Sequence, residues 1–250
     1  VKLDSDVDFV SIAHGTTGFA GADLANVVNE AALLAVRNKR KKVTMEDFNE
    51  AIDKVSIGLK KKSRKDNKKE MRLVSVHETG HALVAAFTPD HEPVNKITVV
   101  PRSHGVGGFT QYREEEEKNF MTKKDLIREV DSLMGGRAAE QILLDDISTG
   151  ASNDIEVATK IAREMVTKYG MSTKLGPMAF GDSEEEVFLG NSIGNKRNYS
   201  EEVASEIDQE IRSIVDTAYK KTRTLLNDNM DRLEYVAQAL LIYETLDAEQ

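Results

Sequence analysis

The hydrophobic positions of this chain recur mostly at the three- and four-residue intervals of α-helices. Helical spacing runs through residues 22–38, 48–55, 73–87, 154–165 and 203–241. Strand-like alternation is confined to residues 94–100, around Ile97 and Val99, and a second strand is expected at 108–112. The pattern predicts a mainly α protein that contains one short β region.

The first two helices form a small bundle of their own. The helix over residues 22–38 is expected to pack through one side, which carries Leu24, Val27, Val28, Ala31 and Val36. Thr44 has the side chain of a helix N-cap, and Glu46 and Asp47 suit the first turn that follows.

A lysine-rich stretch separates this bundle from the rest of the chain. Residues 60–65, with Lys68 and Lys69, interrupt the hydrophobic periodicity. Such a run is either a solvated linker or a basic patch that faces an anionic surface or a neighbouring subunit. We therefore divide the chain into a helical segment over 1–58, a basic linker over 59–70 and a larger domain over 71–250.

The most specific chemical signal is His77-Glu78-Thr79-Gly80-His81. Two histidines four residues apart lie on one face of a helix, so both imidazoles can bind the same ion. Neutral imidazole suits Zn²⁺, and the glutamate beside the first histidine can accept a proton from water at the metal. This H-E-x-x-H pattern is typical of zinc peptidases.

A catalytic zinc normally takes three protein ligands, so a third must come from elsewhere in the chain. Asp154 opens a helix and shares its inward face with Ala158 and Ile161, which favours a ligand, although an N-cap role fits the same position. Glu140 is the competing ligand, but Arg137 three residues earlier offers it an ordinary ion pair. Position alone leaves these alternatives open.

Composition narrows the remaining classes of function. A net charge of −9 argues against nucleic-acid binding, and the absence of cysteine excludes a disulfide framework and thiol chemistry. No phosphate-binding loop of the G-x-x-x-x-G-K-[ST] type occurs, so no cofactor-binding residues are assigned. No apolar run approaches the about 20 residues that span a bilayer, and the start has no signal-peptide pattern.

The order of several motifs resembles the FtsH family of membrane-anchored AAA+ zinc proteases. The resemblance covers essentially the whole chain, and its motifs are the following: residues 77–81, 133–140, 148–154, 175–177, 187–190 and 243–246. Residues 15–24 and 29–33 are similar to the helical lid of the family's ATPase domain.

The resemblance implies a fold, a ligand set and partners. It makes residues 1–58 the AAA+ lid and residues 71–250 a mostly helical zinc peptidase domain. It implies one zinc ion per chain on His77, His81 and Asp154, with Glu140 in a supporting role. It also implies a homo-hexamer that uses ATP and Mg²⁺ through an ATPase domain beyond this chain and degrades unfolded or membrane proteins. An N-terminal anchor beyond this chain would hold the full protein in the bacterial inner membrane, with this otherwise soluble part facing the cytoplasm.

Two expectations about function follow. As an enzyme, the chain is a zinc endopeptidase in which Glu78 is the catalytic base, and Gly107, Gly108, Phe109 and Thr110 belong to an edge strand that binds substrate backbone. The same segment could instead be a structural hairpin packed under the site. The alternative to an enzyme is a non-catalytic, metal-stabilised oligomerisation or interaction module.

Overall fold

The computed structural model describes residues 2–60, 67–102, 107–113, 118, 120–181 and 199–248. Residues 61–66 of the predicted linker, His104 and the motif at 187–190 lie outside the described residues. The predicted boundaries at residues 58 and 70 stay a prediction, because the segment that joins them is only partly described.

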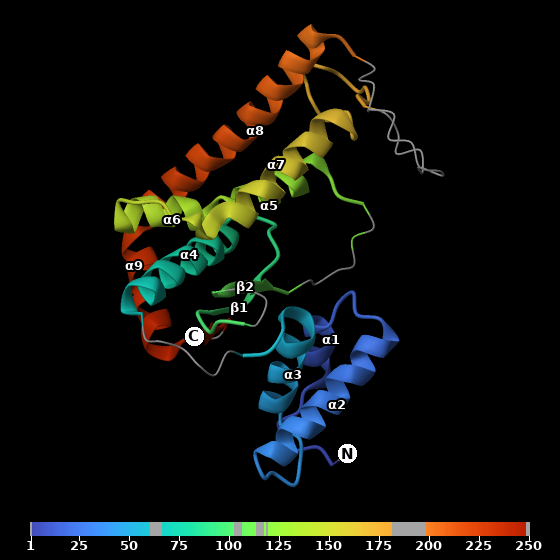
Figure 1. The fold of residues 1–250 in the computed structure, drawn as a ribbon, viewed down its shortest axis with the longest axis vertical. Helices are drawn as coiled ribbons and strands as arrows, with labels where there is room; N and C mark the ends of the chain where they lie inside the picture. The colour runs from blue at the N-terminus through green and yellow to red at the C-terminus, as the bar shows by residue number, and fades with distance from the viewer. Residues whose placement is uncertain are drawn as a thin grey trace, which may run out of the picture. The chain divides into compact units, whose positions relative to one another are not determined.

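The prediction of a mainly α protein is confirmed (Figure 1). The α-helices are α1 (Phe9–Gly15), α2 (Gly21–Arg37), α3 (Met45–Ile57), α4 (Lys68–Phe87), α5 (Lys123–Leu133), α6 (Gly135–Leu144), α7 (Ser152–Thr167), α8 (Glu201–Asp228) and α9 (Met230–Tyr243). A short 3-10 helix, η1 (Thr149–Ala151), precedes α7. The strands are β1 (Val94–Thr98), β2 (Phe109–Tyr112) and β3 (Thr245–Asp247). The predicted elements did not include α1, α5, α6 or β3.

These elements form two compact units. Unit 1 comprises Val1–Glu78, Glu92–Glu117 and Ala237–Gln250, and unit 2 comprises Thr79–His91 and Lys118–Val236. The division passes through the continuous helix α4 between Glu78 and Thr79.

In unit 1, helices α1 to α3 enclose a small core. Thr44 caps α3 as predicted: its side-chain oxygen accepts the Asp47 N–H, while the Asp47 carboxylate accepts the Thr44 N–H. The buried members of the core are Val27, Ala31, Ala35, Val43, Phe48, Ala51 and Ile52.

The predicted inward face of α2 was therefore partly wrong, since Leu24, Val28 and Val36 are exposed. Apolar residues occupy two faces of this helix, and its spacing alone does not say which one packs.

Unit 1 also contains a three-stranded antiparallel sheet in the order β2-β1-β3. β2 pairs only with β1 among the described strands, which makes it an edge strand. Ile97 lies opposite Thr110, and Thr98 lies opposite Phe109. Since successive side chains alternate between faces, Ile97 and Thr110 share one face of the sheet, and Thr98 and Phe109 share the other.

The second of these faces is tied to α3 by ion pairs. Lys96 Nζ lies 2.6 Å from Asp53 Oδ1 and 5.5 Å from the centre of the Phe109 ring. Arg102, which follows β1 and is almost fully buried, binds Glu50 at 2.8 Å and Asp53 at 2.7 Å. These pairs hold the helical bundle against the sheet within unit 1.

In unit 2, the long helix α8 packs along α5, α6 and α7 (Figure 1). Two clusters of buried residues fill the space between these helices: Val130, Met134, Ala158 and Ala218 in one, and Ala162, Val166, Ile207 and Ile211 in the other. The buried face of α8 continues through Thr222 to Leu226. Among the described residues, no helix combines the length and the apolar character needed to cross a membrane.

Candidate metal centre

Helix α4 supports the first two candidate ligands and the candidate base on its buried middle turns. His77, Glu78 and His81 are 8%, 7% and 7% exposed, respectively. Every residue of this helix from 75 to 85 is buried, and His77 and His81 are four residues apart on it. The helix therefore presents both imidazoles in one direction from adjacent turns.

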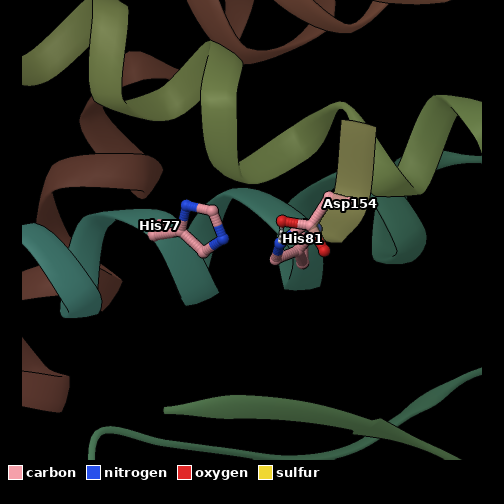
Figure 2. A group of neighbouring side chains, drawn as sticks. All are labelled: His77, His81 and Asp154. Atoms are coloured by element: carbon pink, nitrogen blue, oxygen red, sulfur yellow. Dashed lines mark ion pairs between the residues drawn. The ribbon is translucent and has the colours of Figure 1, made fainter. Parts of the chain in front are cut away.

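Asp154 meets these histidines from the first turn of α7. Figure 2 shows His77 and His81 projecting from α4, with the Asp154 side chain next to His81. One ligand atom from each of the three side chains lies within 4.8 Å of the others. Among the described residues, no other group of three or more His, Asp or Glu side chains converges in this way.

The separation of His81 and Asp154 fits two ligands of a single tetrahedral ion. His81 Nε2 and Asp154 Oδ2 are 3.6 Å apart. Two ligands about 2.0–2.2 Å from one zinc ion, at a tetrahedral angle, are separated by about 3.4 Å. Two imidazoles and one carboxylate also match the His₂-carboxylate donor sets of catalytic zinc sites, which leave a fourth position for water.

The N-cap alternative for Asp154 is wrong. The N-cap of α7 is Ala151, which makes no side-chain capping bond, and Asp154 is the third residue of the helix. Its partly buried side chain is thus left to face His81. Neither Ser152 nor Asn153 is the cap, because both already belong to the helix.

Ser132 orients His81, a role that no sequence pattern indicated. The His81 Nδ1 atom lies 2.8 Å from the Ser132 carbonyl oxygen, at the end of α5. A carbonyl oxygen can only accept, so Nδ1 carries the proton and the Nε2 lone pair faces Asp154. This fixes the tautomer that a metal requires.

The residue before Ser132 joins the end of α5 to α8. The Thr222 hydroxyl donates to the Asp131 carbonyl oxygen at 3.0 Å, and Lys221 contacts the Asp131 carboxylate. Burial raises the pKa of the Asp131 carboxyl, and the neighbouring Lys221 ammonium opposes this effect. Helix α8 thereby holds the end of α5, where the Ser132 carbonyl oxygen accepts the hydrogen bond from His81 Nδ1.

Glu140, the competing ligand, binds protein groups in the segment before α7. It is fully buried and accepts the Ser148 N–H at 2.7 Å and the Ser148 hydroxyl at 3.0 Å. Arg137 donates to the Ser148 carbonyl oxygen at 3.1 Å. Both side chains therefore fix Ser148, six residues before Asp154, which agrees with a supporting role for Glu140. The predicted ion pair between Arg137 and Glu140 stays a prediction.

The backbones of α4 and α6 approach each other beside His81 at two glycines. A methyl group on Gly80 would overlap the Gly135 carbonyl oxygen and come within 2.7 Å of Ala139 Cβ. A methyl group on Gly135 would lie 2.7 Å from the Gly80 carbonyl oxygen and 2.9 Å from His81 Cα. Glycine is required at both positions by this close approach.

The predicted substrate segment lies directly against Glu78. Gly108 is buried, and a methyl group there would lie 2.6 Å from Val74 Cγ1 and 3.0 Å from Glu78 Cγ. The Thr110 hydroxyl lies 3.0 Å from Glu78 Oε2 and 3.1 Å from the Glu78 carbonyl oxygen. The structure therefore places Gly108 and Thr110 beside the candidate base, whereas Phe109 lies on the opposite face and Gly107 is exposed. Contact of this segment with substrate stays a prediction.

Comparison with known proteins agrees with this arrangement. Residues 64–250 match the family described as peptidase family M41, and residues 6–50 match the AAA+ lid domain. An ATP-dependent zinc metalloprotease FtsH of Caldicellulosiruptor bescii is 52% identical over 248 residues, covering 99% of this chain and 40% of the relative. One from Alkaliphilus metalliredigens is 52% identical over 247 residues, covering 99% and 36%, and one from Thermotoga maritima is 46% identical over 248 residues, covering 99% and 41%. The chain thus spans about two fifths of the length of these curated relatives.

The ligand assignment predicts the behaviour of an Asp154→Ala variant. Removing the carboxylate should weaken zinc binding by more than the about 100-fold that loss of a hydrogen-bonding partner of a ligand can cost. Competition with a chromophoric chelator measures this affinity. Glu156→Ala, an exposed carboxylate on the same turn, is the matched control and should bind zinc normally. Wild-type affinity in Asp154→Ala would show that another group completes the site.

The close approach of the two glycines predicts that Gly80→Ala is disruptive. The added methyl group must push α4 from α6, which should cost about 1–3 kcal/mol of unfolding free energy and weaken zinc binding. Urea unfolding and zinc content measure both effects. Gly21→Ala is the control, because a methyl group there meets no atom within 4 Å. If the two variants behaved alike, the packing at Gly80 would not constrain the site.

Proposed function

The chain belongs to peptidase family M41, and we propose that it is the proteolytic part of an ATP-dependent zinc metalloprotease that cleaves peptide bonds in protein substrates. The observation that carries this proposal is the convergence of His77, His81 and Asp154 within 4.8 Å, with Glu78 on the same helix as both histidines. We propose His77, His81 and Asp154 as the zinc ligands and Glu78 as the general base.

The proposed chemistry divides between the ion and the side chains. Bound zinc would polarise the peptide carbonyl and lower the pKa of a water molecule toward about 7. Glu78 accepts a proton from the attacking water and later delivers it to the leaving amine. Ser132 keeps the proton of His81 on Nδ1, so that Nε2 stays available as a ligand.

The open edge of β2 is proposed to bind the substrate backbone. The Arg113 N–H donates to the Pro93 carbonyl oxygen, so the backbone groups of Gln111 and Phe109 also point toward β1. The alternation turns the backbone groups of Thr110 and Tyr112 away from β1, toward the open edge. A substrate that adds as a strand there would be bound mainly through its main chain, which accommodates many sequences.

The assembly is proposed from the family alone. We propose that the full protein is a homo-hexamer, held in the bacterial inner membrane by an anchor outside residues 1–250, with this part facing the cytoplasm. ATP and Mg²⁺ would act in an ATPase domain and would deliver unfolded or membrane proteins to the zinc site.

The catalytic assignment predicts that Glu78→Gln binds zinc but does not cleave protein. Loss of a general base should lower the rate of casein hydrolysis by about 10²–10⁴-fold, while zinc content stays unchanged. Cleavage is measured with the zinc-loaded chain, and the variant serves as the blank. If the wild-type chain bound zinc and assembled but cleaved nothing, the non-catalytic interaction module would become the better description.

The edge-strand proposal predicts a difference between two variants of Thr110. Thr110→Val and Thr110→Pro both lack the hydroxyl, but only proline also lacks the backbone donor. Thr110→Pro should therefore have a KM about 5-fold higher than that of Thr110→Val, which corresponds to one lost hydrogen bond of about 1 kcal/mol. Equal KM values in two zinc-loaded, folded variants would count against substrate pairing at this position.

A further inference from the structure

We propose that Thr110 is a positioning residue for the general base: its hydroxyl holds the Glu78 carboxylate in the rotamer that serves the zinc site. This inference rests on the proposed function of Glu78. It adds to that function a partner on a different element, β2, that sequence spacing does not connect to α4.

The contacts of the hydroxyl support this role. Thr110 Oγ1 lies 3.0 Å from Glu78 Oε2 and 3.1 Å from the Glu78 carbonyl oxygen. The Thr110 hydroxyl thus lies within hydrogen-bonding distance of two oxygens of Glu78, one in the side chain and one in the main chain. A hydroxyl has one proton to donate, and donation to the carboxylate oxygen fixes the side chain more firmly because that acceptor is charged.

Glu78 needs such a partner because a glutamate has three rotatable side-chain bonds. Ordering this side chain costs up to about 1.5–2 kcal/mol of rotamer entropy. A base is effective only when its oxygen is within hydrogen-bonding reach of the proton that it removes. Thr110 supplies such a contact, because its hydroxyl lies 3.0 Å from Oε2 of the Glu78 carboxylate.

The packing and register of β2 place the Thr110 hydroxyl beside Glu78. Gly108 immediately precedes β2, and both Gly108 and Thr110 lie against Glu78. Gly108 lacks the side chain that would collide with Val74 and Glu78, which lets β2 lie against α4. Ile97, opposite Thr110 on the neighbouring strand, is buried on the same face. Thr110 therefore approaches Glu78 as a consequence of strand register.

Steady-state kinetics provides the first test. Thr110→Val keeps the shape of the side chain but removes the hydroxyl, and it should lower kcat about 10- to 100-fold with a KM within about 2-fold of wild type. Thr110→Ser restores the hydroxyl and should recover kcat to within about 3-fold of wild type. Both variants should retain zinc. A Thr110→Val enzyme with wild-type kcat would overturn the proposal.

A double-mutant cycle tests the contact without using activity. In the zinc-loaded chain, Thr110→Val should raise the unfolding equilibrium constant about 10-fold when Glu78 is present, since a hydrogen bond to a charged group is lost. In a Glu78→Ala background, the same change should have an effect below about 3-fold, because the carboxylate is already absent. Equal effects in the two backgrounds would show that the hydroxyl serves only the main chain.

The two measurements separate this inference from the proposed function. A wild-type chain that does not cleave casein, together with clear coupling in the cycle, would refute the peptidase and retain the contact between Thr110 and Glu78. A wild-type chain whose cleavage depends on Glu78, together with an unaffected Thr110→Val variant, would retain the peptidase and refute the positioning role.

Discussion

The candidate metal centre depends on the contact between the backbones of Gly80 and Gly135. A methyl group on either glycine would collide with the carbonyl oxygen of the other glycine. This approach brings α4 close enough to the end of α5 for His81 Nδ1 to reach the Ser132 carbonyl oxygen at 2.8 Å. With that bond formed, His81 Nε2 lies 3.6 Å from Asp154 Oδ2, which brings two of the proposed zinc ligands together.

The segment that precedes Asp154 is held by groups outside the proposed ligand set. Glu140 accepts both the N–H and the hydroxyl of Ser148, and Arg137 binds the Ser148 carbonyl oxygen. The buried Glu140 carboxylate thus fixes the chain just before η1 and α7. Because both Glu140 oxygens accept hydrogen bonds from Ser148, this buried carboxyl has polar partners within the protein.

The sequence predicted the longer helices and the placement of His77 and His81 on one helix, because both depend on regular spacing along one element. Thr44 was predicted as a cap from its own chemistry and is one. Three features could not be predicted in this way. Ser132 contributes a backbone carbonyl, which every residue has, and β3 is too short to show a period. The choice between Asp154 and Glu140 depends on which neighbouring groups each carboxylate meets, and spacing does not contain that information.

The sheet in unit 1 imposes a second constraint, through its register. Ile97 and Thr110 face Glu78, whereas Lys96 and Phe109 lie on the opposite face, where Lys96 binds Asp53 of α3. A shift of β2 by one residue would exchange the two faces and place Phe109 where the Thr110 hydroxyl now lies.

Two features of the strand pairing oppose such a shift. They are the irregular pairing between Val94 and Lys96 and the hydrogen bond from the Arg113 N–H to the Pro93 carbonyl oxygen. Gly108 opposes it as well, because no residue with a side chain fits between β2 and α4 at that point. The partner of the candidate base is therefore selected by the pairing of two short strands, although the base itself is carried by a helix.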